Sequence, residues 1–213
     1  QRRLEHLATL GLDVRNRSVL DVGAGIGSLA SFFINRDCQV TAIEPRRAAR
    51  SVLNERYPTV TVLEHDFETV EHGPPPRREI VLAYSVLDHM KDPTAALERM
   101  VAATKAMLLI ETRVSLAADD SISVFEESAA VPALGIHGYG CNPSRLWIFN
   151  RLKRLLPHVY VPATQPNHPD FPTNWASPIL RPNAARAVFI AARRPIENAQ
   201  LLDYVPDRQE RAP

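Results

Sequence analysis

The sequence predicts an α/β fold in which helices cover both faces of a mostly parallel sheet. A strand pattern over residues 19–22 leads through three glycines into a helical pattern that opens at Ser28. Strand and helix patterns then alternate, which is typical of sheets whose strands are joined by crossover helices. Residues 106–111 form an apolar run typical of a strand that is buried on both faces.

The glycine run distinguishes between ligands. Gly23, Gly25 and Gly27 let the backbone take a positive φ and let a ligand approach closely. A dinucleotide site has its third glycine one position later, where this chain has Ser28. The acid Asp21, just before the turn, suits a ligand with an ammonium group better than one with phosphates. The turn therefore favours S-adenosylmethionine (SAM), which has an amino-acid end and a sulfonium but no phosphate.

Three more strand patterns follow in order. The strand expected at 39–44 ends in Glu44, roughly 20 residues past the glycines, where a carboxylate can accept hydrogen bonds from both ribose hydroxyls. After a helical pattern over 46–56, the strand expected at 60–67 ends in an Asp-Phe pair. The next strand pattern, 79–84, runs into a polar segment that begins at Ser85.

In this order and spacing, the four motifs resemble those of the class I SAM-dependent methyltransferases, over about residues 4–112. The resemblance implies a seven-stranded, Rossmann-like, mostly parallel sheet with helices on both faces and an antiparallel last strand. It also implies that Asp66 receives the adenine amino group and that SAM leaves as S-adenosylhomocysteine (SAH). The expected cofactor-binding residues are Asp21, Gly23, Ala24, Gly25, Gly27, Glu44, Pro45, Asp66, Phe67, Tyr84 and Ser85.

Later patterns complete the expected sheet. Helices are predicted at 93–104 and 142–156, and strands at 106–111, 158–161 and 185–192. We therefore expect a single methyltransferase domain over 1–194, with its SAM-binding part at about 1–112. Residues 195–213 are polar and contain prolines, which predicts an extended C-terminal tail.

Two long loops, at about 112–142 and 162–184, are expected to form the acceptor pocket, because ligands in such sheets bind at the carboxyl ends of the parallel strands. The aromatic and polar residues of these loops suit a hydroxylated acceptor. The alternatives are that the aromatic residues pack in the interior and that the arginine forms a surface ion pair. The expected substrate-binding residues are Tyr139, Arg145, Asn174 and Trp175.

Methyl transfer to an alcohol needs a group that removes the hydroxyl proton, and histidine is the usual base. Three histidines are expected at the carboxyl ends of the strands: His89, His137 and His168. His89 ranks first because it follows the fourth strand. Each has a simpler interpretation as well, since His89 can cap a helical segment and the other two can pack within loops.

Composition excludes several classes of function. The 213 residues have a formal net charge of +1, and no basic stripe stands out, so a nucleic-acid partner is not expected. No apolar run approaches the roughly 18 residues that span a bilayer. Two cysteines predict neither a metal site nor a disulfide framework, and a reduced, cytoplasmic protein is the default. The chain starts at Gln1, which leaves a preceding natural segment open, and the oligomeric state is open too.

The sequence thus predicts a SAM-dependent methyltransferase that acts on a small-molecule or glycan-like acceptor, with O-methylation and a histidine base as the first hypothesis. N- or C-methylation of a small metabolite is the enzyme alternative. A non-catalytic SAM-binding regulatory subunit is the alternative from another class. A nicotinamide oxidoreductase is disfavoured by the glycine spacing.

Overall fold

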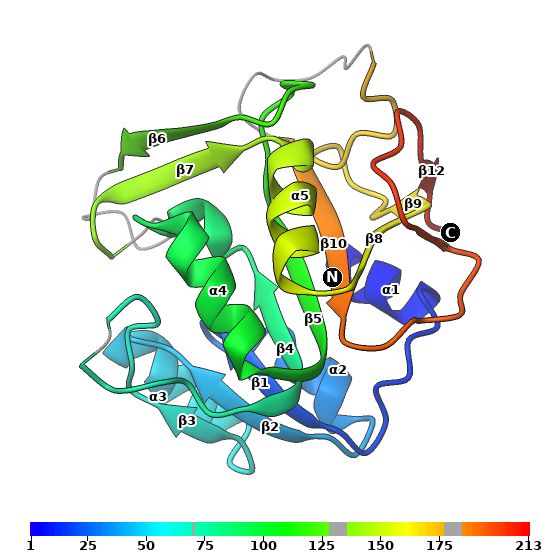
Figure 1. Ribbon diagram of the computed structural model, residues 1–213. Helices are drawn as coiled ribbons and strands as arrows, with labels where there is room; N and C mark the ends of the chain where they lie inside the picture. The colour runs from blue at the N-terminus through cyan, green and yellow to red at the C-terminus, as the bar shows by residue number, and fades with distance from the viewer. Residues whose placement is uncertain (70, 128–135, 177–184) are drawn as a thin grey trace.

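The computed structural model describes residues 1–69, 71–127, 136–176 and 185–213. One twisted sheet runs through the molecule and carries helices on both faces (Figure 1). Its strands, in sheet order, are β11 (Leu201–Leu202), β8 (His158–Pro162), β10 (Arg186–Ala192), β5 (Thr104–Arg113), β4 (Arg78–Tyr84), β1 (Ser18–Val22), β2 (Gln39–Ile43) and β3 (Thr61–Leu63).

The strand directions confirm the expected mixed sheet. Parallel pairing joins β3, β2, β1, β4 and β5, whereas β10 runs antiparallel to both β5 and β8. It follows that β8 is parallel to β5. The described part of the sheet has one strand more than the seven predicted, because β11 adds to the outer edge of β8.

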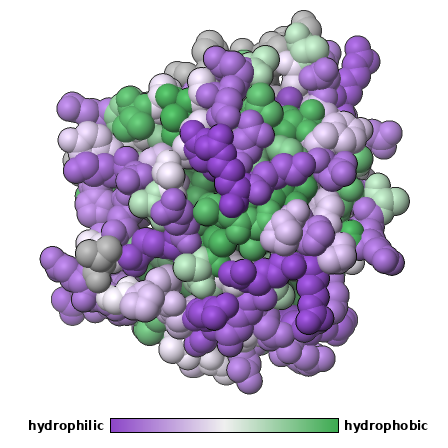
Figure 2. Space-filling view, viewed as in Figure 1, coloured by the Kyte–Doolittle hydropathy of each residue, from purple (hydrophilic) through white to green (hydrophobic). Residues whose placement is uncertain are grey.

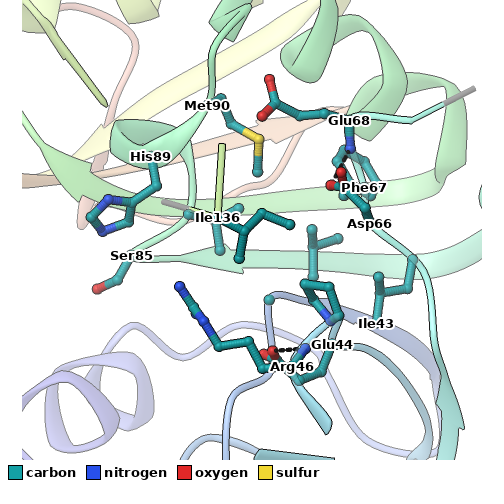
Figure 3. A pocket seen from close by; sticks show the side chains of 14 residues that line it. Ile43, Glu44, Arg46, Asp66, Phe67, Glu68, Ser85, His89, Met90 and Ile136 are labelled. Carbon is teal, nitrogen blue, oxygen red and sulfur yellow. Dashed lines mark hydrogen bonds between the residues drawn. The ribbon is translucent and has the colours of Figure 1, made fainter. Parts of the chain in front are cut away.

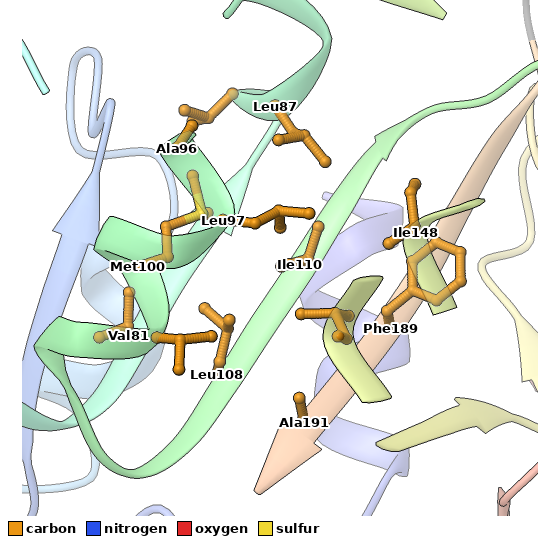
Figure 4. Packing of buried hydrophobic residues seen from close by; sticks show 14 of the residues in the cluster. Val81, Leu87, Ala96, Leu97, Met100, Leu108, Ile110, Ile148, Phe189 and Ala191 are labelled. Carbon is orange, nitrogen blue, oxygen red and sulfur yellow. The ribbon is translucent and has the colours of Figure 1, made fainter. Parts of the chain in front are cut away.

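The described helices divide between the two faces of the sheet. On one face, α4 (Pro93–Ala103) and α5 (Arg145–Leu155) pack on β4, β5 and β10 (Figure 4). On the other face lie α1 (Arg2–Thr9), α2 (Ala30–Ile34) and α3 (Arg47–Arg56). Figure 2 shows hydrophilic residues over most of the first face, with apolar side chains in view near its middle. None of the described helices is long and apolar enough to cross a membrane.

Side chains at the helix starts explain where α4 and α5 begin. Asp92 Oδ1 accepts a hydrogen bond from Ala95 N at 3.0 Å, and Ser144 Oγ accepts one from Trp147 N at 3.0 Å. Such caps satisfy backbone N–H groups that have no partner inside the helix. The expected start of the second helix, at 142, was therefore early, and Pro143 instead ends β7 (Tyr139–Pro143).

The segment predicted as a loop over 112–142 contains a β-hairpin. β6 (Ile122–Glu126) pairs antiparallel with β7, so that Val124 lies opposite Cys141. The hairpin projects from the end of β5, away from the main sheet (Figure 1). Because both Val124 and Phe125 are exposed, β6 lacks the alternation of buried and exposed residues by which a strand is recognised in a sequence.

Residues 195–213 have the extended backbone that the sequence predicts, but they lie on the domain. β11 pairs with β8, and β12 (Glu210–Arg211) pairs in parallel with β9 (Thr164–Gln165). Gln209, directly before β12, is buried, and its Nε2 donates to Pro162 O at the end of β8 at 2.6 Å. The segment after 194 is thus packed into the same core region as the loop after β8.

Candidate active site

A cavity opens at the carboxyl ends of β1, β2 and β4, where the fold class places its ligands (Figure 3). Figure 3 shows His89 and Ser85 together at one end, and Asp66 with Phe67 at the other. Ile136, from the segment that leads into β7, lies over the middle. The lining residues are Val22, Gly23, Ile43, Glu44, Pro45, Arg46, Asp66, Phe67, Glu68, Ser85, Val86, His89, Met90 and Ile136.

The glycine turn leads from β1 to α2 beside this cavity. Gly25 has a φ of +57°, and a Cβ added to it would meet nothing within 4 Å, so the turn leaves open space there. Glycine is needed at position 27 for a different reason, since a Cβ added there would lie 2.3 Å from Leu53 Cδ1 in α3. Gly25 thus leaves open space at the turn, and Gly27 lets the turn pack closely against α3.

Glu44 directly follows β2 and holds the glycine turn through a hydrogen bond. Its buried carboxylate accepts hydrogen bonds from Gly25 N at 2.8 Å and from Arg46 N at 2.8 Å, one on each oxygen. A carboxylate has about four lone-pair sites, so each oxygen keeps capacity for a ligand hydroxyl. Asp21 lies in β1 beneath the turn, where burial, followed by the charge of Glu44, raises its pKa to about 7.

At the opposite end of the cavity, the Asp66 carboxylate is in contact with His137. His137 Nε2 lies 2.5 Å from Asp66 Oδ2 and 3.8 Å from Glu68 Oε2. Phe67 is buried beneath them, with the Arg99 guanidinium 5.6 Å from its ring centre. The structure therefore places His137 with the residue predicted to receive adenine, and away from His89.

His89 ends a short 3₁₀ helix, η1 (Leu87–His89), that follows β4. Its Nδ1 lies 3.0 Å from Glu127 Oε2, and its Nε2 lies 3.7 Å from Asp88 Oδ2. Gly140 in β7 leaves the space for Glu127, because a Cβ there would lie 2.6 Å from the Glu127 Cδ. Two buried carboxylates therefore flank one imidazole ring at the Ser85 end of the cavity.

Ser85 separates this cavity from a second one and lies directly after β4. Its φ of +57° is rare for a residue with a side chain. The hydroxyl accepts from Arg3 Nη1 at 2.6 Å and from Arg186 Nη2 at 2.7 Å, and it donates to Glu111 Oε2 at 3.2 Å. Its hydrogen-bonding capacity is thus filled within the chain.

The remaining predicted site residues have other contacts. The Tyr84 hydroxyl is buried, has no hydrogen-bond partner among the described residues, and has a pKa raised chiefly by burial. His168 lies in the second cavity, where its Nδ1 accepts from Asp170 N at 3.2 Å. Tyr139 stands beside Lys91, whose Nζ is 5.2 Å from the ring centre.

Three predicted substrate-binding residues hold the C-terminal segment instead. The Arg145 guanidinium stacks 3.8 Å from the Trp175 ring centre and donates to Pro206 O at 2.8 Å. Trp175 Nε1 donates to Gln209 Oε1 at 2.7 Å. Asn174 forms an isolated bridge with Arg208. None of the three lines either cavity in the described part of the chain.

Sequence reasoning missed three residues that the structure brings to the site: Glu127, Arg3 and Arg186. Glu127 belongs to a loop predicted to bind the acceptor, but nothing in the sequence pairs it with His89. Arg3 and Arg186 come from α1 and β10 and meet at Ser85 only in the folded chain. Because they lie at opposite ends of the sequence, no local pattern could have joined them.

Comparison with known proteins gives a matching family and one curated relative. The family model described as a methyltransferase domain matches residues 1–183. The relative is the ubiquinone biosynthesis O-methyltransferase of Serratia proteamaculans (strain 568), which is 29% identical over 97 residues. That match covers 44% of this chain and 40% of the relative, so it spans less than half of either protein.

Solved structures share the fold. The N-terminal domain of EvdMO1, crystallised in the presence of SAH and D-fucose, superposes with a TM-score of 0.71 at 16% identity, over 91% of this chain and 84% of that one. The 1,6-didemethyltoxoflavin-N1-methyltransferase of Burkholderia thailandensis, with bound 1,6-didemethyltoxoflavin and SAH, gives a TM-score of 0.59 at 19% identity, over 90% of this chain and 76% of that one. A SAM-dependent methyltransferase of Mesorhizobium loti gives 0.64 at 14% identity, over 91% and 98%.

Proposed function

This chain belongs to the methyltransferase-domain family, and from that premise we propose that it methylates a hydroxyl group of a small-molecule or glycan-like acceptor, with SAM as donor and His89 as general base. The observation that carries the proposal is the hydrogen bond between His89 and Glu127 at the Ser85 end of the cavity. A histidine held by a carboxylate is the arrangement by which a base is kept in one orientation and one tautomer.

The residues around the cavity fit SAM. The open space at Gly25 accommodates a ligand against the backbone, and Glu44 keeps lone pairs for the ribose hydroxyls. The Asp66 carboxylate can accept a hydrogen bond from the adenine amino group once His137 Nε2 moves away from Asp66 Oδ2. When bound, SAM supplies an electrophilic methyl group on its sulfonium.

His89 is oriented for proton removal. Glu127 Oε2 accepts from Nδ1–H, which leaves the lone pair of Nε2 to take a proton from an acceptor hydroxyl. The resulting imidazolium is stabilised by Glu127 on one side and by Asp88, 3.7 Å from Nε2, on the other. The β6–β7 hairpin carries both Glu127 and Ile136, so the same element orients the base and covers the cavity.

We assign the base to His89 rather than to the two other predicted histidines. His137 contacts Asp66 at the opposite end of the cavity, and the His168 ring is bonded to the backbone of its own loop. The O-methyltransferase name of the Serratia relative favours oxygen as the acceptor atom. N-methylation, the activity named for the Burkholderia protein, is the alternative, and the products of an acceptor screen distinguish it from O-methylation.

The test has two stages. Calorimetric titration with SAH, with NAD as control, measures cofactor binding by the wild-type chain. A screen of hydroxylated and amino acceptors then compares the wild type with His89→Gln by mass spectrometry of the products. We expect micromolar SAH binding in both proteins and O-methylated products from the wild type alone. N-methylated products, or equal turnover by His89→Gln, would overturn the assignment.

A further inference from the structure

We propose that the second cavity, on the other side of Ser85, binds an oxyanion group of the acceptor, a carboxylate or a phosphate, through Arg3 and Arg186. The proposal rests on the function proposed above, because it defines the acceptor of the same reaction. The cavity is lined by Arg3, Ser85, His168, Asp170, Phe171 and Arg186, together with the first two residues of the chain. Ser85 lines both cavities, so a ligand bound here adjoins the His89 end of the first.

The charges in this cavity are unevenly matched. Arg3 Nη1 lies 2.9 Å from Glu111 Oε2, and Arg186 Nε donates to the other oxygen of the same carboxylate. Two guanidinium groups thus share one fully buried acid. Asp88 lies 3.8 Å from Arg186 Nη1 and 3.6 Å from Arg113 Nε, and Arg113 Nη1 also lies 3.8 Å from Glu127 Oε1. Among the described residues, Glu111 is therefore the one acid within hydrogen-bonding distance of the Arg3 and Arg186 side chains.

Asp170 also lines the cavity and its charge acts on Arg186, but its side chain is 43% exposed, which weakens that interaction, and it forms no ion pair with either arginine among the described residues. Arg3 is 36% exposed at the cavity and uses only Nη1 in its contacts with the described residues. Its remaining N–H groups are available to a ligand. A guanidinium fork matches a carboxylate or phosphate geometrically, so an oxyanion is the ligand that this excess positive charge favours.

Ser85 holds both guanidinium groups in place before any ligand arrives. Its hydroxyl accepts from each arginine and donates to Glu111, so the four side chains form a closed network. Such prior ordering reduces the entropy that is lost when a ligand binds. The positive φ of Ser85 is the backbone conformation at which this network is built.

The wall beside the arginines is aromatic. Phe171 is buried, and the His168 ring meets it edge to face, with the ring centres 6.4 Å apart. An acceptor that suits the cavity therefore combines an acidic group with a flat or apolar body, and its nucleophilic hydroxyl extends past Ser85 to His89. Benzoate, phenyl phosphate and the neutral benzamide are probes that share this body and differ in charge.

The experiment is calorimetry of the three probes on the SAH-saturated full chain. We expect benzoate or phenyl phosphate to bind at least tenfold more tightly than benzamide, and the stronger of the two to identify the oxyanion. Arg3→Gln should weaken that binding roughly tenfold or more, since it removes a charged hydrogen bond. Arg154→Gln, which removes the same charge from an exposed position on α5, should not.

Arg186→Lys is the second variant, because it keeps a cation beside buried Glu111 while losing the fork. Equal binding of benzoate and benzamide, no binding of either anion, or full affinity in both Arg3→Gln and Arg186→Lys would overturn the proposal. A further result would also overturn it: Arg3→Gln binds SAH more weakly than the wild type but binds 5′-methylthioadenosine, which lacks the amino-acid end, with unchanged affinity. Arg3 would then bind the carboxylate of the cofactor and not an oxyanion of the acceptor. Failure of the proposed function is a separate result: wild-type chain that does not bind SAH, or undiminished turnover by His89→Gln.

Discussion

His89 Nδ1 lies 3.0 Å from Glu127 Oε2, across 38 residues of sequence and between two elements that are not neighbours in the sheet. The η1 turn after β4 supplies the histidine, and the end of the β6–β7 hairpin supplies the carboxylate. The hairpin and the sheet therefore have to be docked for the proposed base to be oriented. This couples the covering of the cavity to the chemistry inside it.

The first prediction concerns this pair. His89→Gln should lower kcat by roughly 10² to 10⁴, the range of general-base contributions, and Glu127→Gln should lower it by at least about tenfold. Glu127 acts through His89, so its loss should also shift the pH dependence of kcat while SAH affinity stays unchanged. Glu126→Gln, the exposed neighbouring position, is the matched control. Equal losses in the two glutamate variants would show that the effect comes from the hairpin as a whole.

The second prediction concerns Glu44. Both carboxylate oxygens accept backbone N–H groups, and a glutamine amide can keep only one of these hydrogen bonds. Glu44→Gln should therefore loosen the glycine turn and weaken SAH binding about tenfold in calorimetry. Asp37→Asn, which removes an acid from the turn between α2 and β2, serves as the control. Unchanged SAH affinity in Glu44→Gln would remove this residue from the cofactor site.

Local patterns account for what the sequence predicted correctly. The strands β1, β2, β4 and β5 are short apolar runs bounded by turn residues, and each is buried on both faces, so periodicity and composition agree. The β6 strand was missed because Val124 and Phe125 face solvent and no core imposes alternation on them. The residues of the candidate site, whose roles stay predictions, depend on the sequence in two ways. Gly25 and Glu44 belong to local motifs, whereas Arg3 and Arg186 are brought together only by the folded sheet.

The C-terminal segment explains why two residues predicted to bind the substrate do not line a cavity in the described part of the chain. Arg145 and Trp175 have the chemistry of ligand-binding residues, and the sequence places them near the carboxyl ends of strands. In the structure, Arg145 donates to Pro206 O and Trp175 Nε1 donates to Gln209 Oε1, and both partners belong to the segment predicted to be an extended C-terminal tail. Nothing local indicates that a polar, proline-containing segment folds back, because its pairing with β8 and β9 is made over long range.

The third prediction concerns pH. Burial raises the pKa of Asp21 to about 7, so the folded chain holds a proton there that the unfolded chain releases near pH 4. Between about pH 4 and 7 the folded state therefore binds more protons, and stability falls as pH rises. The free energy of unfolding of the wild type, minus that of Asp21→Asn, should decrease over this range and level off above it. Buried His6, with a pKa lowered to about 4, acts oppositely but cancels in the difference. A flat difference would contradict the raised pKa.

The fourth prediction concerns Gln209. Its side chain accepts from Trp175 Nε1 and from Gln165 Nε2, and donates to Pro162 O, all in the interior. Gln209→Ala leaves these buried groups without partners, at a cost of about 1–3 kcal/mol each before the structure relaxes. Urea unfolding should show a clear loss of stability, and the exposed Gln200→Ala should show almost none. If both variants unfold alike, the C-terminal segment does not contribute to the stability of the domain.

The fifth prediction separates the backbone of Ser85 from its hydroxyl. Ser85→Ala and Ser85→Gly both lose the three hydrogen bonds to Arg3, Arg186 and Glu111, but only glycine is free of the cost of a Cβ at a φ of +57°. The glycine variant should therefore be more stable than the alanine variant, by about 1 kcal/mol in urea unfolding. At Ser51, an exposed position within α3, the same pair should show the opposite order, because glycine is less favourable than alanine in a helix. The same order at both positions would mean that the left-handed conformation of Ser85 is not maintained in solution.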